Sequence, residues 1–170
     1  MIRGKKFVDV LNEWLSSKLD KIHTVLPGRI EHYYGHTQRK AKVQPLVKLR
    51  NIKNKIIEIN PIDDVPILFP GSSNTNILFP INKNDGCLLL FAESAIGNWL
   101  SNGGVVEADD LSRFDLTDCI AIPGLWSFAN APILPFANDN DFFIFYENAK
   151  IQIEKTTNTV NINDNLEVLI

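Results

Sequence analysis

The sequence predicts a mainly β protein, in which a helix precedes a small β-barrel and a separate group of strands follows it. Two observations support this fold class. Between residues 28 and 124, short apolar segments recur at near-regular spacing and are separated by turn residues such as Asp85-Gly86. After residue 140, the pattern changes to short strands in which apolar and polar residues alternate, broken by Asn, Thr and Asp.

Composition is ordinary for a globular chain of 170 residues, with 45% hydrophobic and 22% charged residues. The net charge of −3 predicts no general attraction to nucleic acids or anionic membranes. Positive charge is concentrated in residues 39–55, a basic block without an acidic residue. The two cysteines lie in apolar segments and match no metal-binding pattern, so we expect buried, reduced thiols. The N-terminus lacks the apolar core of a secretory signal, so we expect synthesis in the cytoplasm.

Residues 1–26 form the first predicted region, with an amphipathic helix over residues 5–26 that Pro27-Gly28 would end. Apolar residues recur there at spacings of three and four: Val8, Leu11, Leu15, Leu19, Ile22 and Leu26. The apolar face of such a helix must pack against another surface. The sequence leaves open whether that surface is its own barrel or a neighbouring subunit.

Residues 27–124 are predicted to form a barrel of five or six strands. A short helix over residues 94–102 would close one end of the barrel with Trp99. Strands are expected at residues 29–34, 39–45, 56–59, 65–69, 77–79, 87–91 and 119–122. The expected barrel core consists of Ile67, Phe69, Leu89, Phe91, Trp99 and Ile120.

Residues 125–140 are rich in Pro, Ala and Asn and are predicted to be a linker, followed by strands in residues 141–170. These strands are too few to enclose a core alone, because each buries only one face. Three chains wound into a trimeric β-helix or β-prism would enclose one; the alternative is a hairpin folded back on the barrel. The residues expected at the trimer axis are Ile151, Ile153, Val160, Ile162, Leu166 and Val168.

No catalytic, cofactor-binding or metal-binding residues are predicted. The sequence contains no G-x-S-x-G, H-E-x-x-H or phosphate-binding glycine motif. We interpret Asp63-Asp64 and Asp109-Asp110 as solvated acids in loops, and His32 and His36 as ordinary surface or turn histidines. The expected function is therefore structural rather than enzymatic.

Several segments, in a conserved order along residues 5–128, resemble a known protein family. They are PGRI (27–30), TQRKAKVQP (37–45), DVPILFP (64–70), NDG (84–86), NWLSNGG (98–104) and RFDLTDCIAIPG (113–124). The chain resembles the N-terminal OB-fold domain of central spike proteins from contractile-tailed phages and related tail machines. In that family the barrel precedes a trimeric β-helix, which forms a membrane-piercing needle under the baseplate.

The resemblance implies a homotrimer in the tail baseplate of a virion or of a phage-like particle. Its implied partners are the tail hub, tube and baseplate proteins, with transient contact to the host outer membrane and no nucleic acid. Some needles of the family end in a His-x-His pair that holds iron, but this chain has no histidine after His36. The sequence also ends on the apolar pair Leu169-Ile170, for which we expect either a separate tip protein as a cap or an unusually short needle.

The alternative function is an OB-fold protein that binds single-stranded nucleic acid. OB barrels bind oligonucleotides through basic grooves lined by aromatic side chains. The basic block of residues 39–55 would supply the charge, and Tyr33, Tyr34 and Trp126 would stack on bases. These aromatic residues are not interleaved with the block, which favours the structural role.

Overall fold

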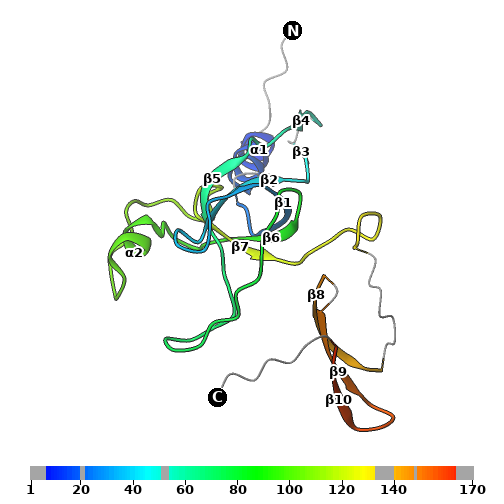
Figure 1. Ribbon diagram of the computed structural model, residues 1–170. Helices are drawn as coiled ribbons and strands as arrows, with labels where there is room; N and C mark the ends of the chain where they lie inside the picture. The colour runs from blue at the N-terminus through cyan, green and yellow to red at the C-terminus, as the bar shows by residue number, and fades with distance from the viewer. Residues whose placement is uncertain (1–6, 20–21, 51–53, 133–139, 148, 164–170) are drawn as a thin grey trace. The chain divides into compact units, whose positions relative to one another are not determined.

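The computed structural model describes residues 7–19, 22–50, 54–132, 140–147 and 149–163. The chain divides into two compact units, Met1–Asn130 and Ala131–Ile170. The first contains the helices and a curled sheet, and the second contains a small sheet of its own (Figure 1).

The first unit is built on a five-stranded antiparallel sheet. Its strands are β1 (Val25–Tyr33), β2 (Lys40–Pro45), β5 (Ile62–Pro66), β6 (Gly86–Phe91) and β7 (Cys119–Pro123), in the order β5-β2-β1-β6-β7. The sheet curls into a half-barrel, so that its two outer strands approach each other (Figure 1). A parallel bridge joins the segment after β5 to β7, where the amide of Leu68 donates to the carbonyl of Ala121 at 2.9 Å.

Alternation along the strands places the core inside the curl. In β2, Ala41 and Val43 are fully buried, whereas Lys40 and Lys42 point outward. The buried cluster comprises Ile30, Ala41, Val43, Ile62, Val65, Ile67, Phe69, Ile81, Cys87, Leu89, Phe91, Cys119 and Ala121. As predicted, both cysteines are buried and free.

The first strand begins earlier than the sequence predicts. Helix α1 covers Phe7–Leu19, and Leu26 lies in β1 opposite Leu89 rather than in a helix. Gly28 does not stop a helix but lies in β1, between β2 and β6. A Cβ at this position would lie 2.8 Å from Cγ1 of Val43 and 3.0 Å from Sγ of Cys87, so close packing requires glycine here.

Trp99 and Ile120 are not in the barrel core. Helix α2 (Gly97–Asn102) has no buried residue, and Trp99 is 49% exposed. Ile120 is half-buried because Cys119 and Ala121 occupy the inward positions of β7. The strand expected at residues 77–79 is not formed, since these residues belong to no sheet.

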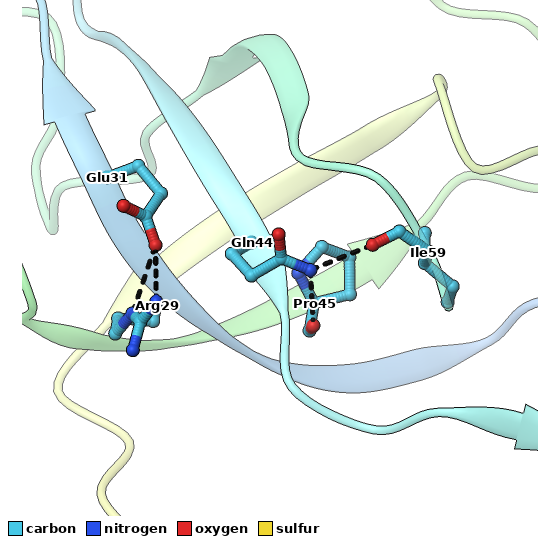
Figure 2. Close-up of polar contacts among 5 residues, drawn as sticks. All are labelled: Arg29, Glu31, Gln44, Pro45 and Ile59. Carbon is cyan, nitrogen blue, oxygen red and sulfur yellow. Dashed lines mark hydrogen bonds and ion pairs between the residues drawn. The ribbon is translucent and has the colours of Figure 1, made fainter. Parts of the chain in front are cut away.

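Polar side chains also form hydrogen bonds at the surface of the half-barrel. Figure 2 shows the Gln44 amide donating to the carbonyls of Pro45 and Ile59, at 2.9 and 2.8 Å. The second bond holds the chain that leads into β5 against β2. Arg29 donates two hydrogen bonds to Glu31, its neighbour two residues along β1, at 3.1 and 2.6 Å (Figure 2). A small hairpin, β3 (Leu49–Arg50) and β4 (Ile56–Ile57), lies between β2 and β5 in sequence.

The second unit is a three-stranded antiparallel sheet. Strands β8 (Phe142–Tyr146), β9 (Ala149–Glu154) and β10 (Thr159–Asn163) pair in chain order, with β9 in the centre. Asn158, with a φ of 53°, helps to form the turn between β9 and β10, a conformation that asparagine tolerates. The single chain thus forms an antiparallel meander. Residues 164–170, expected to hold a further strand, lie outside the described residues.

Candidate assembly surface

The register of the three-stranded sheet gathers large apolar side chains on one face. Phe142 of β8 and Val160 of β10 both lie opposite Ile153 of the central strand. One row further along, Ile144 and Ile162 both lie opposite Ile151. Because side chains of directly opposed residues share a face, these rows and the adjoining Tyr146 form one continuous apolar face.

Solvent reaches all of this apolar face in the single chain. Its seven large side chains are between 39% and 60% exposed: Phe142, Ile144, Tyr146, Ile151, Ile153, Val160 and Ile162. Exposed apolar patches of this kind mark interaction sites in stable proteins, since burying them is favourable. The face is therefore the strongest candidate for a functional surface in the described residues.

The other face of the sheet is largely polar and internally bonded. Asn161 donates to Glu154 at 2.7 Å, and Lys150 donates to Gln152 at 2.9 Å. Gln152 in turn donates to Asp141 at 2.9 Å. The sheet is thus amphipathic, and the apolar face is the one that needs a cover.

Four of the six expected trimer-axis residues lie on this face: Ile151, Ile153, Val160 and Ile162. The other two, Leu166 and Val168, lie outside the described residues. Sequence reasoning missed Phe142 and Ile144, although their alternation in the segment DFFIFY was a usable signal.

Helix α1 carries a second exposed apolar surface. None of its residues is buried, and its large apolar side chains are 49% to 79% exposed: Phe7, Val8, Val10, Leu11, Trp14, Leu15 and Leu19. Lys18 lies over the Trp14 ring, with its Nζ 5.9 Å from the ring centroid. A 13-residue helix is marginal in water without such a face being packed, so α1 also fits an assembly role.

Three lysines of the basic block lie close to carboxylates. Lys40 lies 3.8 Å from Asp64, Lys42 lies 3.0 Å from Asp63, and Lys48 pairs with Glu58. The hydrogen bond from Lys42 lowers the pKa of Asp63 and raises the pKa of Lys42 itself. These lysines are the ones that a nucleic-acid groove would have needed, and each already has an anionic partner.

Asp63 and Asp64 lie in a strand rather than in a loop, which corrects the expectation from sequence. Ala41 pairs with Val65 and Val43 with Ile62, so both acids lie opposite Lys42 in a β-bulge. Asp64 adopts a φ of 57° there. The bulge aims both carboxylates at the lysines of β2.

The other polar residues singled out from sequence have structural roles. Asp109 accepts a hydrogen bond from the amide of Asn98 at 2.8 Å, in the first turn of α2. His36 lies 2.9 Å from the Tyr33 hydroxyl through its Nδ1. His23, which the sequence did not single out, lies beside Phe91 with ring centroids 5.6 Å apart and a tilt of 51° between the rings, and burial lowers its pKa. In the part of the chain that the structure describes, no group of three or more His, Cys, Asp or Glu side chains is arranged to hold a metal ion.

Comparison with models of known protein families gives a match in the first unit. The model of a family described as the phage protein Gp138 N-terminal domain matches residues 26–124, more than half of the chain. That span begins and ends with the curled sheet. No curated protein matches the sequence. None of the helices in the described ranges combines the length and apolar character needed to cross a lipid bilayer. Because the family model covers more than half of the chain, the chain belongs to the family of phage proteins defined by the Gp138 N-terminal domain.

Proposed function

We propose that this protein is a non-enzymatic structural subunit of the central spike, or of its hub, in a contractile phage tail or a related tail particle. It acts there as a homotrimer. The membership in a phage protein family supports a place in the virion. The observation that carries the proposal is the exposed apolar face of the β8–β10 sheet.

Three copies of this sheet would cover one another's apolar faces. A three-stranded sheet with one bare face is marginal alone, and identical copies supply complementary faces in a closed cyclic arrangement. The seven side chains then form the axis of a β-prism. Strands interlocked in this way transmit axial force without leaving a free apolar face.

The connectivity of the first unit supports the OB-fold half of the proposal. Its central strand β1 pairs with β2 and β6, the outer strands are β5 and β7, and the bridge between those outer strands is parallel. That is the pairing order of a five-stranded Greek-key barrel. In the proposed assembly the barrel and α1 bind the tail hub, tube and baseplate proteins. A separate protein caps the needle where it meets the host outer membrane.

The test is the absolute mass of the full chain in solution, measured by light scattering. The wild-type protein is expected to be a trimer. Replacing Ile153 and Ile162 together with aspartate places two unpaired charges per chain at the proposed axis, which costs more than the apolar contact gains. The double variant is expected to be a monomer.

A matched control adds the same number of charges to the polar face. Gln152→Lys with Asn161→Lys modifies the same two strands on the side that carries Asp141 and Glu154. This control should remain trimeric. A doubly substituted Ile153→Asp and Ile162→Asp protein that stays trimeric would remove the basis for the axis, and a monomeric wild-type chain would refute the assembly itself.

A further inference from the structure

The small hairpin between β2 and β5 carries apolar side chains that its own barrel leaves open to solvent. We call residues 46–50 and 54–58, which include β3 and β4, the basic hairpin. Its ladder consists of two residue pairs, Leu49 with Ile57 and Arg50 with Ile56. A ladder of this length is marginal in water unless another surface packs against it. Four large apolar side chains of the hairpin are 43% to 51% exposed: Leu46, Val47, Ile56 and Ile57.

The basic hairpin is also positively charged. Arg50 donates to the side-chain oxygen of Asn54 at 2.7 Å, and because that partner is neutral, the guanidinium charge is not cancelled. Lys48 pairs with Glu58, the only acid among the hairpin's described residues. With Lys55, these residues hold three bases and one acid, which leaves a net charge of +2.

The segment between β6 and β7 has the opposite charge. We call residues 92–118, which include α2, the acidic insert. It contains six acids and one base, Arg113, which pairs with Glu93 at 3.0 Å. Hydrogen bonds from neutral groups hold four further carboxylates in the charged form without cancelling their charge. The donors are the amides of Ile96 to Asp118, Asn98 to Asp109, Ser112 to Asp110 and Thr117 to Asp115.

Bases outside the acidic insert do not balance this charge. On its barrel side, Arg39 and Lys40 line a groove beside α2 together with Asp63 and Asp64. Lys40 lies 3.8 Å from Asp64, and Lys42 lies 3.0 Å from Asp63. These three bases and two acids leave +1, whereas the six acids and one base of the insert leave −5.

The acidic insert also has apolar side chains at its surface. Val105 and Leu111 are fully exposed, and Trp99 and Leu100 are about half exposed. Exposed apolar side chains next to charged ones are typical of surfaces that bind another protein. The insert and the basic hairpin are therefore complementary in charge, and both have apolar surface to bury.

The two surfaces lie at opposite ends of the β2–β5 strand pair and so do not cover each other. The hairpin joins the end of β2, at Pro45, to the start of β5, at Ile62. Helix α2 instead lines the groove that contains Lys40, at the start of β2, and Pro66, at the end of β5. Lys40 and Pro66 are paired with each other at that end of the ladder. Two unlike surfaces on one subunit suit a cyclic oligomer, because each copy then contacts its two neighbours through different surfaces.

We propose that the acidic insert of one copy binds the basic hairpin of the next copy, which closes the three barrels into a ring. The inference rests on the proposed trimer and adds a second contact to it, since the apolar face of the β8–β10 sheet involves neither surface. Charge complementarity orients the two surfaces, and the contact buries apolar side chains of both. Loss of the ring contact alone therefore leaves a trimer held by its axis.

Cysteine crosslinking of the full chain tests the ring. Ile57→Cys combined with Leu111→Cys places one exposed thiol on each surface, whereas the native Cys87 and Cys119 are buried. After treatment with a short bismaleimide, the double variant should run as a covalent trimer on a denaturing gel, and each single variant as a monomer. The matched control combines Ile57→Cys with Asn74→Cys, at an exposed residue outside both surfaces, and should give no covalent trimer.

Charge reversal tests whether complementary charges make the contact. Arg50→Glu with Lys55→Glu should lower the crosslinked fraction at least about tenfold, because like charges then meet. Adding Glu107→Lys and Asp110→Lys to that variant should restore crosslinking, which a merely misfolded protein would not do. Light scattering should give the mass of a trimer for both variants.

The possible outcomes separate the ring from the proposed function. Absence of crosslinking in a protein that light scattering shows to be a trimer would overturn the ring and leave the proposed function standing. A covalent dimer from Ile57→Cys alone would mean that two hairpins meet, which also overturns it. Unchanged crosslinking after charge reversal would refute the complementarity that carries the inference. A monomeric chain that forms no crosslinks would refute the ring and the proposed trimer together.

Discussion

A methyl group added at Gly28 would enter space that the barrel core already fills. The new Cβ would lie 2.8 Å from Val43 Cγ1, 3.0 Å from Cys87 Sγ and 3.2 Å from Leu89 Cδ1. Optimal carbon contacts are about 3.5–4.0 Å, so all three neighbours would have to move. They are fully buried, and close-packed interiors resist such movement.

These distances set the expected magnitude. Overpacking of a core by one methyl group costs about 1–3 kcal/mol. Alanine also restricts the unfolded chain, which returns about 0.4–1 kcal/mol because Gly28 does not adopt a positive φ. With both terms near the middle of their ranges, the free energy of unfolding of Gly28→Ala should fall by about 1.3 kcal/mol.

Urea unfolding followed by circular dichroism at a fixed protein concentration measures this change. The midpoint should fall while the dependence on urea stays constant. Val43→Ala removes the closest contact, so the double variant should lose less stability than the two single variants together. Gly35→Ala is the control, because a Cβ at this position would meet no atom within 4 Å. Its loss of stability arises instead from the φ of +92°, which alanine rarely adopts. Combining it with Val43→Ala should therefore leave that loss unchanged. An unchanged or raised midpoint for Gly28→Ala would refute the packing argument.

Three further predictions concern the same barrel. Leu89→Ala should lower the free energy of unfolding by about 2–5 kcal/mol in urea titrations, because a fully buried side chain leaves a cavity; a loss well under 1 kcal/mol would contradict the burial. Cys87 and Cys119, whose pKa values burial raises to about 12, should react with a thiol reagent only after unfolding, and rapid labelling of the native protein would contradict this. Burial lowers the pKa of His23, and this effect outweighs that of Asp115, which raises it. As the pH falls, His23 is therefore protonated in the unfolded chain before it is protonated in the folded one. The folded protein keeps its full stability above the unfolded pKa of 6.5 and loses stability as the pH falls through 6.5 toward the folded pKa. The urea midpoint should therefore fall more between about pH 7.5 and about pH 5.5 for the wild type than for His23→Gln, and equal losses would exclude the histidine as the cause.

The parts of the fold that sequence predicts best are those in which the local pattern and the pairing agree. Alternation of Ala41 and Val43 with lysines marks β2 and also identifies its buried face. The apolar rows of the β8–β10 sheet follow from the same period of two. In both cases the position of a residue along its own strand determines on which face of the sheet its side chain lies.

The incorrect predictions concern residues whose position is set by contacts with a segment distant in the sequence. Leu26 continues the apolar spacing of the helix, yet pairing with Leu89 draws it into β1, and no local pattern encodes that partner. Asp63-Asp64 has the composition of a loop, but Lys42 pairs with Asp63 and Lys40 with Asp64 from the adjacent strand, and the two acids lie in a bulge there. The sequence predicts that the short helix carrying Trp99 closes one end of the barrel, but this six-residue helix has no buried residue and leaves Trp99 half exposed. A groove lined by Asp64, Trp99 and Ile120 brings together segments that are far apart in the sequence. No single segment therefore carries a pattern that predicts it.

Every residue of the buried core cluster lies between Ile30 and Ala121, and none belongs to the unit that begins at Ala131. The buried core of the half-barrel therefore contains no residue from the strands that follow it. Recombination between genes at the segment joining the two units would exchange one tail for another without disturbing that core. Such modular exchange would let a lineage of phages replace the strands that follow the half-barrel while keeping the half-barrel itself unchanged.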